Sequence, residues 1–346
     1  MSAQRRFISA QEAQRPLFVG ADVGGTNVKI GVVDDLGRPM SWLSVPTDRA
    51  AGPLAGARRI GQGVLDTIAQ AGLQPADVAS VGLGTPGPMD VTAGVLLDSP
   101  NLQGWENFPI VGRVAEVCRL PITYVNDAGA ATYGEFWVGC GRNYHNMVML
   151  TLGTGIGGGI VIDDRLLDGE NYHAAELGHT VIDWHEDARW CGCGQTGHLE
   201  AYASATALVK RAAEALAVGV PSSLAGRVAA GEELTPMMIG QEAEAEDTLA
   251  LRLVLETARF IGIACVTFVH AIDPAALVIG GAMTFGGERE PLGRRFLETI
   301  REEVRRRCFP IPAERVAIEY ATLGGDAGYI GAAGLARAAR NKQNHQ

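Results

Sequence analysis

The chain has 346 residues, of which 47% are hydrophobic and 20% are charged, and its formal net charge is −10 at pH 7. Such a chain is long enough to bury a full hydrophobic core, and its composition is that of a globular protein. The excess of acidic residues argues against a nucleic-acid partner, since phosphate neutralisation needs surplus Lys and Arg. No apolar stretch reaches the length of a membrane span, so no membrane partner is expected and a small-molecule substrate is favoured.

The cysteines and the N-terminus indicate a reducing compartment. Four of the six cysteines are scattered singly, which is not a disulfide framework. Residues 1–16 contain basic side chains but no apolar run of the kind found in a signal peptide. We therefore expect a cytoplasmic protein with reduced thiols, in which residues 1–16 form a flexible tail.

The first predicted element is a β-hairpin over residues 17–34, where two apolar runs flank a Gly-Gly-Thr-Asn turn, and a third run at 40–45 is expected to extend it. The elements that follow are a helix at 52–70, a strand at 78–85, a helix at 109–118, a strand at 121–125, a helix from 127, two strands within 146–164, helices at 204–217 and 248–271, a strand at 276–279, and helices at 291–306 and 326–340.

Two segments of the chain share one pattern. Residues 17–34 and 146–164 each consist of an apolar run, a turn rich in Gly and Thr, and a second β-rich run that ends in acidic residues. A strand-turn-strand unit that recurs at this separation predicts a duplicated domain.

Both turns carry residues suited to phosphate binding. In the first turn the glycines free the backbone to approach an anion, Thr26 adds a hydroxyl donor, and Asp22 is placed to hold the water shell of a magnesium ion; the alternative is a tight hairpin alone. The second turn has five glycines within residues 153–159, which is costly for a strand unless something approaches its backbone. A β-rich run follows instead of a helix, so this is not a dinucleotide-binding fingerprint.

Asp127 lies where a predicted strand ends and a predicted helix begins. A carboxylate there can accept the proton of a substrate hydroxyl as it attacks phosphorus. The alternative is that Asp127 caps the helix, and the sequence alone favours the cap.

His179, Cys191, Cys193 and His198 form an H-x11-C-x-C-x4-H pattern. Two thiolates and two imidazoles suit tetrahedral zinc, and four protein ligands leave no open coordination position, so the metal would be structural. A redox pair of cysteines is the alternative. A zinc hydrolase with Glu176 or Glu200 as its base would require that His198 does not bind the metal.

Eight motifs occur in the order found in one known family. They are DVGGTNVKIGVVD, GLGTPGPMD, SPNLQGW, VNDAGAATYGE, LGTGIGGGIVID, AELGH, CGCGQTGHLE and DPAALVIGGAM, and over residues 17–340 the chain resembles the ROK family of sugar kinases, most of all its bacterial glucokinase branch. The resemblance implies an α/β fold of the actin/hexokinase-like (ribonuclease H-like) type, with two duplicated domains and an interdomain cleft. The expected small domain comprises residues 17–125 and 326–346, and the large domain, with the zinc site, comprises 126–325.

The resemblance also implies the reaction and the residues that perform it. ATP with Mg²⁺ would phosphorylate a hexose, above all glucose to glucose 6-phosphate, with Asp127 as the general base. The residues implied to bind the sugar are Asn101, Asn126, Asp127, Glu176, His179 and Glu200. The residues implied to bind the nucleotide are Asp22, Gly24, Gly25, Thr26, Asn27, Thr154, Gly155, Gly280 and Gly281. The zinc would hold one ring nitrogen of His179 so that the other contacts a sugar hydroxyl.

The chain departs from the family pattern at two positions. His198 replaces a third cysteine of the zinc motif, and Gly129 replaces an asparagine that commonly follows the catalytic aspartate. The motifs are shared by kinases of N-acetylmannosamine, N-acetylglucosamine and other hexoses, some relatives use polyphosphate, and the family also contains sugar-sensing transcriptional regulators. A regulator would need a helix-turn-helix segment before the first hairpin, which starts at Leu17. A homodimer or a tetramer is the family expectation.

Overall fold

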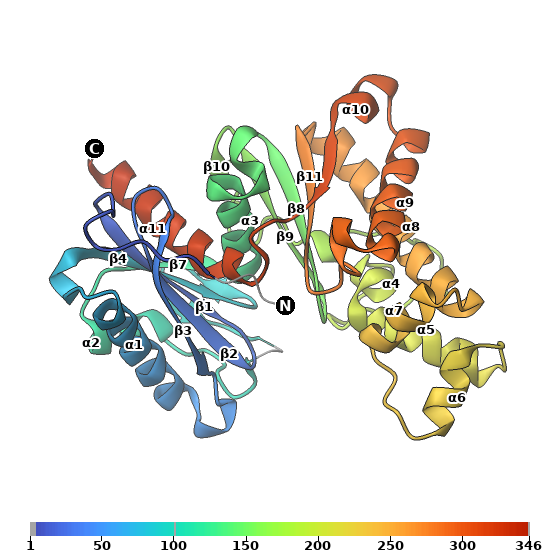
Figure 1. Ribbon diagram of the computed structural model, residues 1–346, viewed down its shortest axis with the longest axis horizontal. Helices are drawn as coiled ribbons and strands as arrows, with labels where there is room; N and C mark the ends of the chain where they lie inside the picture. Colours follow the sequence, from blue (N-terminus) through green and yellow to red (C-terminus); the bar gives the residue numbers. More distant parts are fainter. Residues whose placement is uncertain (1–4, 100–101, 345–346) are drawn as a thin grey trace. The chain divides into compact units, whose positions relative to one another are not determined.

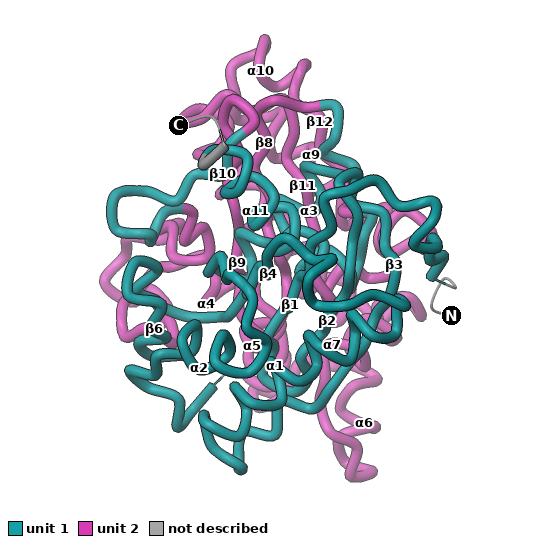
Figure 2. The backbone as a smooth tube through the Cα atoms, turned by 90° about the vertical axis from the view of Figure 1, so that its left-hand side faces the viewer, with its two compact units in different colours: residues 1–143, 165–174, 322–346 teal, residues 144–164, 175–321 magenta. Residues whose placement is uncertain are grey.

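The structure is a computed structural model that describes residues 5–99 and 102–344. The chain forms two compact units, shown in different colours in Figure 2. Unit 1 comprises residues 1–143, 165–174 and 322–346, and unit 2 comprises residues 144–164 and 175–321.

Unit 1 is built on a five-stranded sheet of order β3-β2-β1-β4-β7 (Figure 1). Its strands are β1 (Leu17–Val23), β2 (Asn27–Val33), β3 (Pro39–Pro46), β4 (Val78–Thr85) and β7 (Ile122–Asn126). The first three strands form an antiparallel meander, whereas β4 and β7 join β1 in parallel. A short ribbon of β5 (Met89–Asp90) and β6 (Val95–Leu96) follows β4.

Helices cover both faces of this sheet. The helices of unit 1 are α1 (Pro53–Gln70), α2 (Ile110–Cys118), α3 (Asp127–Val138) and α11 (Ala327–Asn344). Alternate residues of β1 point to opposite faces, so Val19 packs with α1 and α2 whereas Phe18 packs with α11. A Cβ atom at Gly20 would overlap the carbonyl oxygen of Tyr329 in α11. Glycine at that position therefore lets α11 lie directly on the sheet.

The second five-stranded sheet has the order β10-β9-β8-β11-β12, and its strands other than β10 belong to unit 2. Its strands are β8 (Met147–Leu152), β9 (Ile156–Ile162), β10 (Arg165–Leu166), β11 (Ala276–Gly281) and β12 (Ala317–Tyr320), and the helices that follow are α4 (Glu200–Ala203), α5 (Ala205–Ala217), α6 (Ser223–Ala229), α7 (Pro236–Glu244), α8 (Thr248–Ile272), α9 (Pro291–Arg307) and α10 (Pro310–Arg315). The hairpin β8-β9 is antiparallel, and β11 and β12 run parallel to β8. The order β9-β8-β11-β12 repeats the order β2-β1-β4-β7 of unit 1, which confirms the predicted duplication.

The units divide the chain differently from the predicted domains. The segment 126–143, which contains α3 and was predicted to belong to the large domain, lies in unit 1. The reason is close packing of α3 on α11: a Cβ atom at Gly331 would overlap the carbonyl oxygen of Ala130. The unit to which such a short helix belongs depends on the element it packs against, and the helix's length and composition do not reveal that element.

The N-terminal segment lies against unit 1 from Arg5 onward. Arg5 donates to Asp326 at 2.8 Å, and the backbone N–H of Ile8 donates to the carbonyl oxygen of Pro39 at 3.0 Å. For the described part of this segment, these bonds are at odds with the flexible tail predicted for residues 1–16. Among the described residues, no helix is both long enough and apolar enough to cross a membrane.

Candidate active site and metal centre

The turn between β1 and β2 carries the first predicted group of nucleotide-binding residues. The backbone N–H of Gly24 donates to the carbonyl oxygen of Asn27 at 3.0 Å, which closes the turn. Thr47, the residue after β3, holds the turn: its hydroxyl donates to the carbonyl oxygen of Gly24 at 2.6 Å, and its N–H donates to the carbonyl oxygen of Thr26 at 2.9 Å. Gly25 lies within this turn, where Thr26 and Asn27 are exposed. The turn is thus held at the base and open at the tip, as a phosphate-binding turn requires.

Asp22 lies at the end of β1 opposite Lys29 of β2. A Cβ atom at Gly328 would overlap its carboxylate, so Asp22 lies against the first turn of α11. Burial raises the pKa of the Asp22 carboxyl, and the positive charge of Lys29 opposes that rise. A cation beside such a carboxyl stabilises its ionised form, because the cation offsets the cost of burying the negative charge.

At the junction of β7 and α3, the residue that caps the helix is Asn126, and Asp127 follows it. The side-chain oxygen of Asn126 accepts from the N–H groups of Ala128 at 2.9 Å and of Gly129 at 3.1 Å, so Asn126 is the N-cap. Asp127 is the first residue of the helix, and its Oδ1 accepts from Ala128 N–H at 2.7 Å. The N-cap is therefore Asn126 and not Asp127, to which the alternative interpretation had assigned it. Gly129 still takes part in the capped turn despite lacking the family's asparagine side chain.

The four predicted metal ligands come together in unit 2. One ligand atom from each of His179, Cys191, Cys193 and His198 lies within 4.8 Å of all the others. The Nδ1 atoms of the two histidines are 3.3 Å apart, Cys191 Sγ lies 3.7 Å from His179 Nδ1, and Cys193 Sγ lies 3.2 Å from His198 Nδ1. Tetrahedral zinc with its usual bond lengths would separate two nitrogens by about 3.3 Å and a nitrogen from a sulfur by about 3.6 Å. The donor set and its spacing therefore fit zinc.

Burial favours the uncharged forms of two of these ligands, Cys191 and His198. Burial raises the pKa of the Cys191 thiol to about 11. Burial and the neighbouring His179 lower the pKa of His198, which keeps its imidazole neutral, the form that binds metals. A dication at this point would reverse the preference of the thiol, because a coordinated thiol loses its proton.

The loop that carries the ligands is fixed by contacts that the sequence did not reveal. The hydroxyl of Tyr202 donates to Asp183 at 2.5 Å and accepts from the N–H of Arg189 at 2.8 Å. Gly197 has a φ of 78°, and its carbonyl oxygen accepts from the N–H of Ile182 at 2.9 Å. Asp183 and Tyr202 lie nineteen residues apart, and no motif pointed to their pairing.

Glu200, a predicted sugar ligand, lies beside both the metal cluster and the second glycine turn. Its Oε1 is 3.6 Å from Cys191 Sγ, and its Oε2 accepts from the N–H of Ile156 at 2.8 Å. A Cβ atom at Gly155 would overlap Oε2. The structure thus brings Glu200 together with His179 through the metal loop and with Gly155 directly.

The remaining predicted residues are placed as follows. Glu176 is exposed, and its carbonyl oxygen accepts from the N–H of His179 at 3.0 Å. Gly280 and Gly281 end β11, where Gly281 has a φ of 91° and lies directly against the backbone of Leu152. Thr154 lies in the turn after β8. Asn101 lies outside the described residues. Asp22, Gly24, Gly25, Thr26, Asn27, Asn126 and Asp127 belong to unit 1, and the other described site residues belong to unit 2.

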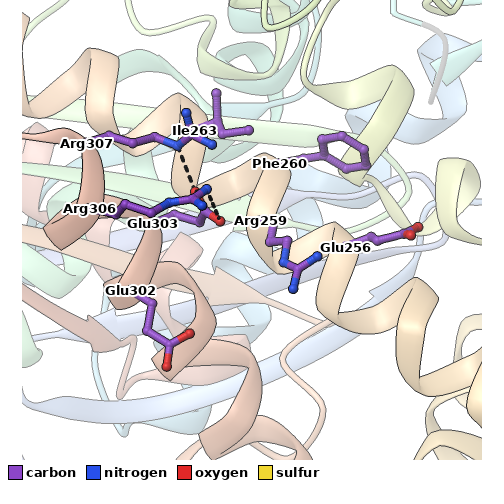
Figure 3. Close-up of a pocket in the computed structure, with 8 residues that line it drawn as sticks. All are labelled: Glu256, Arg259, Phe260, Ile263, Glu302, Glu303, Arg306 and Arg307. Atoms are coloured by element: carbon purple, nitrogen blue, oxygen red, sulfur yellow. Dashed lines mark hydrogen bonds and ion pairs between the residues drawn. The ribbon is translucent and has the colours of Figure 1, made fainter.

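A groove on unit 2 lies elsewhere, between α8 and α9 (Figure 3). Its volume is about 460 Å³, and none of the predicted site residues lines it. Glu303 accepts from Arg306 and Arg307 within it, and three acidic side chains balance three arginines. This balance of charge does not mark it as an anion site.

The repeated strand order and the two glycine turns define a protein of the actin- and hexokinase-like class. The model of the ROK family matches residues 18–339, and the chain belongs to that family. It is 34% identical over 325 residues to a glucokinase of Halalkalibacterium halodurans, a match that covers 94% of this chain and 96% of the relative.

Two solved structures are similar over nearly the whole chain. A ROK hexokinase from Thermus thermophilus is 32% identical with a TM-score of 0.76, and the match covers 92% of this chain and 97% of that one. A ROK family glucokinase from Streptomyces griseus, in complex with glucose and AMPPNP, is 32% identical with a TM-score of 0.75, and the match covers 93% and 100%.

Proposed function

We propose that this protein is a glucokinase, which transfers the γ-phosphoryl group of ATP to the 6-hydroxyl of glucose and releases ADP and glucose 6-phosphate. The names of its similar relatives support this activity. The observation that carries it is the start of α3, where Asn126 caps the helix and Asp127 takes the next position. Because Asn126 already caps the helix, we infer that the Asp127 carboxylate serves the reaction in addition to its bond with the N–H of Ala128.

In this mechanism Asp127 accepts the proton of the 6-hydroxyl as that oxygen bonds to the γ-phosphorus. The bond between the γ-phosphorus and the bridging oxygen breaks, and ADP leaves with the electron pair. Asn101, Asn126, Glu176, His179 and Glu200 bind the sugar hydroxyls. The alternative substrates are N-acetylmannosamine, N-acetylglucosamine and other hexoses.

The nucleotide is proposed to lie against both glycine turns. Backbone N–H groups of Gly25 and Thr26, and of Thr154 and Gly155, would hold the phosphates, and Gly24 and Asn27 close the first turn through their backbone hydrogen bond. Gly280 and Gly281 would contact the nucleoside. Asp22 would hold the water shell of Mg²⁺, which supplies positive charge to the phosphates when bound.

Zinc is proposed as a structural ion held by His179, Cys191, Cys193 and His198. Four protein ligands close its coordination, so it would act by fixing the loop. In the structure Nδ1 of His179 faces His198 and Cys191. Its Nε2, on the far side of the ring, is then the atom that donates to a sugar hydroxyl.

We further propose a homodimer or tetramer in the cytoplasm that acts in glycolysis. A sugar-sensing regulator of the same family is the second candidate. An assay of sugar-phosphate formation across glucose, mannose, fructose and the two N-acetylhexosamines, with ATP or polyphosphate as donor and with ADP release followed in the ATP reactions, separates these possibilities. We expect glucose to give the highest kcat/KM of these sugars, with ATP as the donor. Sugar binding without formation of a sugar phosphate from any sugar, with either donor, would contradict the kinase and favour the regulator.

A further inference from the structure

The turn between β8 and β9 is attached to the segment that carries Glu200. The N–H of Ile156 donates to Glu200 Oε2 at 2.8 Å. The N–H of Ala205 donates to the carbonyl oxygen of Gly153 at 2.9 Å, and the hydroxyl of Thr206 donates to that of Thr154 at 2.8 Å. One short segment, residues 200–206, therefore holds the turn at three points.

Gly155 is explained by its approach to Glu200. A side chain at this position would overlap Oε2 of the glutamate. On its other side the carboxylate is limited by the metal loop, since Oε1 lies 3.6 Å from Cys191 Sγ. Glu200 thus has little room to move unless the glycine turn moves with it.

We propose that Glu200 couples hexose binding to the conformation of the phosphate-binding turn, an inference that rests on the proposed function. A sugar hydroxyl that donates to Oε1 fixes the plane of the carboxylate and thereby keeps Oε2 on the N–H of Ile156. Phosphates that order the turn fix the same carboxylate in return. Because such coupling is reciprocal, glucose and nucleotide raise each other's affinity by one common factor.

Isothermal titration calorimetry tests this without turnover. Glucose is titrated into the wild-type protein with and without AMPPNP and Mg²⁺, and AMPPNP with and without glucose. We expect each ligand to tighten the other by about 5-fold or more. Independent affinities for two ligands that both bind would overturn the coupling and leave the proposed function intact. Failure of the wild type to bind glucose would instead refute the proposed function.

Gly155→Ala locates the coupling, with Gly153→Ala as its control. The added methyl group in Gly155→Ala displaces Glu200, so glucose affinity should fall by about 10-fold or more and lose its response to AMPPNP. A Cβ atom at Gly153 would meet only the carbonyl oxygen of Gly155, at 3.9 Å, so this variant should bind glucose like the wild type. Equal glucose affinities of the two variants would overturn the proposal.

A double-mutant cycle and a second variant complete the test. If Gly155→Ala acts through the glutamate, it has no further effect on glucose affinity in a Glu200→Ala background, and additive losses would contradict the proposal. Thr206→Val removes a different attachment of the turn at nearly constant shape. It should lower the coupling factor by about 2-fold or more and leave glucose affinity without nucleotide unchanged. Should Gly155→Ala fail to fold, full coupling in Thr206→Val would overturn the proposal.

Discussion

Glu135 is a fully buried carboxylate near the end of α3, and replacing it perturbs unit 1 in a calculable way. Its Oε1 accepts from the N–H of Leu323 at 2.6 Å, and its Oε2 accepts from the hydroxyl of Thr322 at 3.0 Å and the N–H of Cys140 at 3.1 Å. A negative charge in the last turn of a helix opposes the helix dipole, so these donors are what stabilise it.

The magnitude follows from the three donors. Glu135→Ala leaves all three without this partner, and at about 1 kcal/mol or more for each the free energy of unfolding should fall by at least about 3 kcal/mol. Glu135→Gln keeps one acceptor oxygen but places an NH₂ group against a donor, which should cost about 1–3 kcal/mol. Both variants remove the negative charge, but only alanine removes both acceptor oxygens. A larger loss of unfolding free energy in Glu135→Ala than in Glu135→Gln would therefore show that the acceptors matter more than the charge.

Urea unfolding followed by circular dichroism measures these differences, from the transition midpoint and slope. Glu116→Gln is the control, because that side chain is exposed on α2 and should change stability by less than about 0.5 kcal/mol. If Glu135→Ala unfolded within about 1 kcal/mol of the wild type, the buried donors would have other partners and the reasoning would fail.

Two further predictions concern the metal loop and pH. Cys193→Ser should lower the zinc affinity at least about 10-fold, measured as zinc content after dialysis, whereas Cys308→Ser should keep the wild-type content; equal contents would contradict the ligand set. Burial alone would raise the pKa of Asp34, but hydrogen bonds from Arg38 and from the N–H of Gln14 outweigh burial and lower it. Its stabilising effect is thus present above the unfolded pKa of about 3.9 and lost as pH falls through the lower folded value. Asp34→Asn should lose stability at pH 7 and approach the wild type below about pH 4, and an equal loss at pH 3 and pH 7 would contradict this assignment.

The sequence predicted those parts of the fold that depend on local patterns. The hairpins at 17–34 and 146–164 were predicted because runs of Val and Ile flank turns of Gly and Thr, and their repetition indicated the duplication that the strand orders confirm. The short strand β12, in contrast, was not predicted. It has only four residues, and its pairing with β11 is a tertiary contact.

The same distinction holds for the site. The metal ligands could be predicted because all four lie within a short stretch of chain whose spacing is itself the signal. The sequence could not predict whether Asn126 or Asp127 caps α3, since both residue types are good caps and only the backbone geometry decides. The contact of Glu200 with Ile156 spans forty-four residues and depends on how α4 packs on the hairpin, which no local pattern records.

The role of Asp127 as general base is tested most directly by Asp127→Asn, with kcat and glucose affinity measured on the same preparation. Asparagine has nearly the same shape and can still accept from the N–H of Ala128, but it cannot take the proton of a sugar hydroxyl. We expect kcat for glucose-dependent ADP release to fall by about 10²–10⁴-fold, while the dissociation constant for glucose from calorimetry changes by less than about 3-fold. Turnover at the wild-type rate would contradict the account.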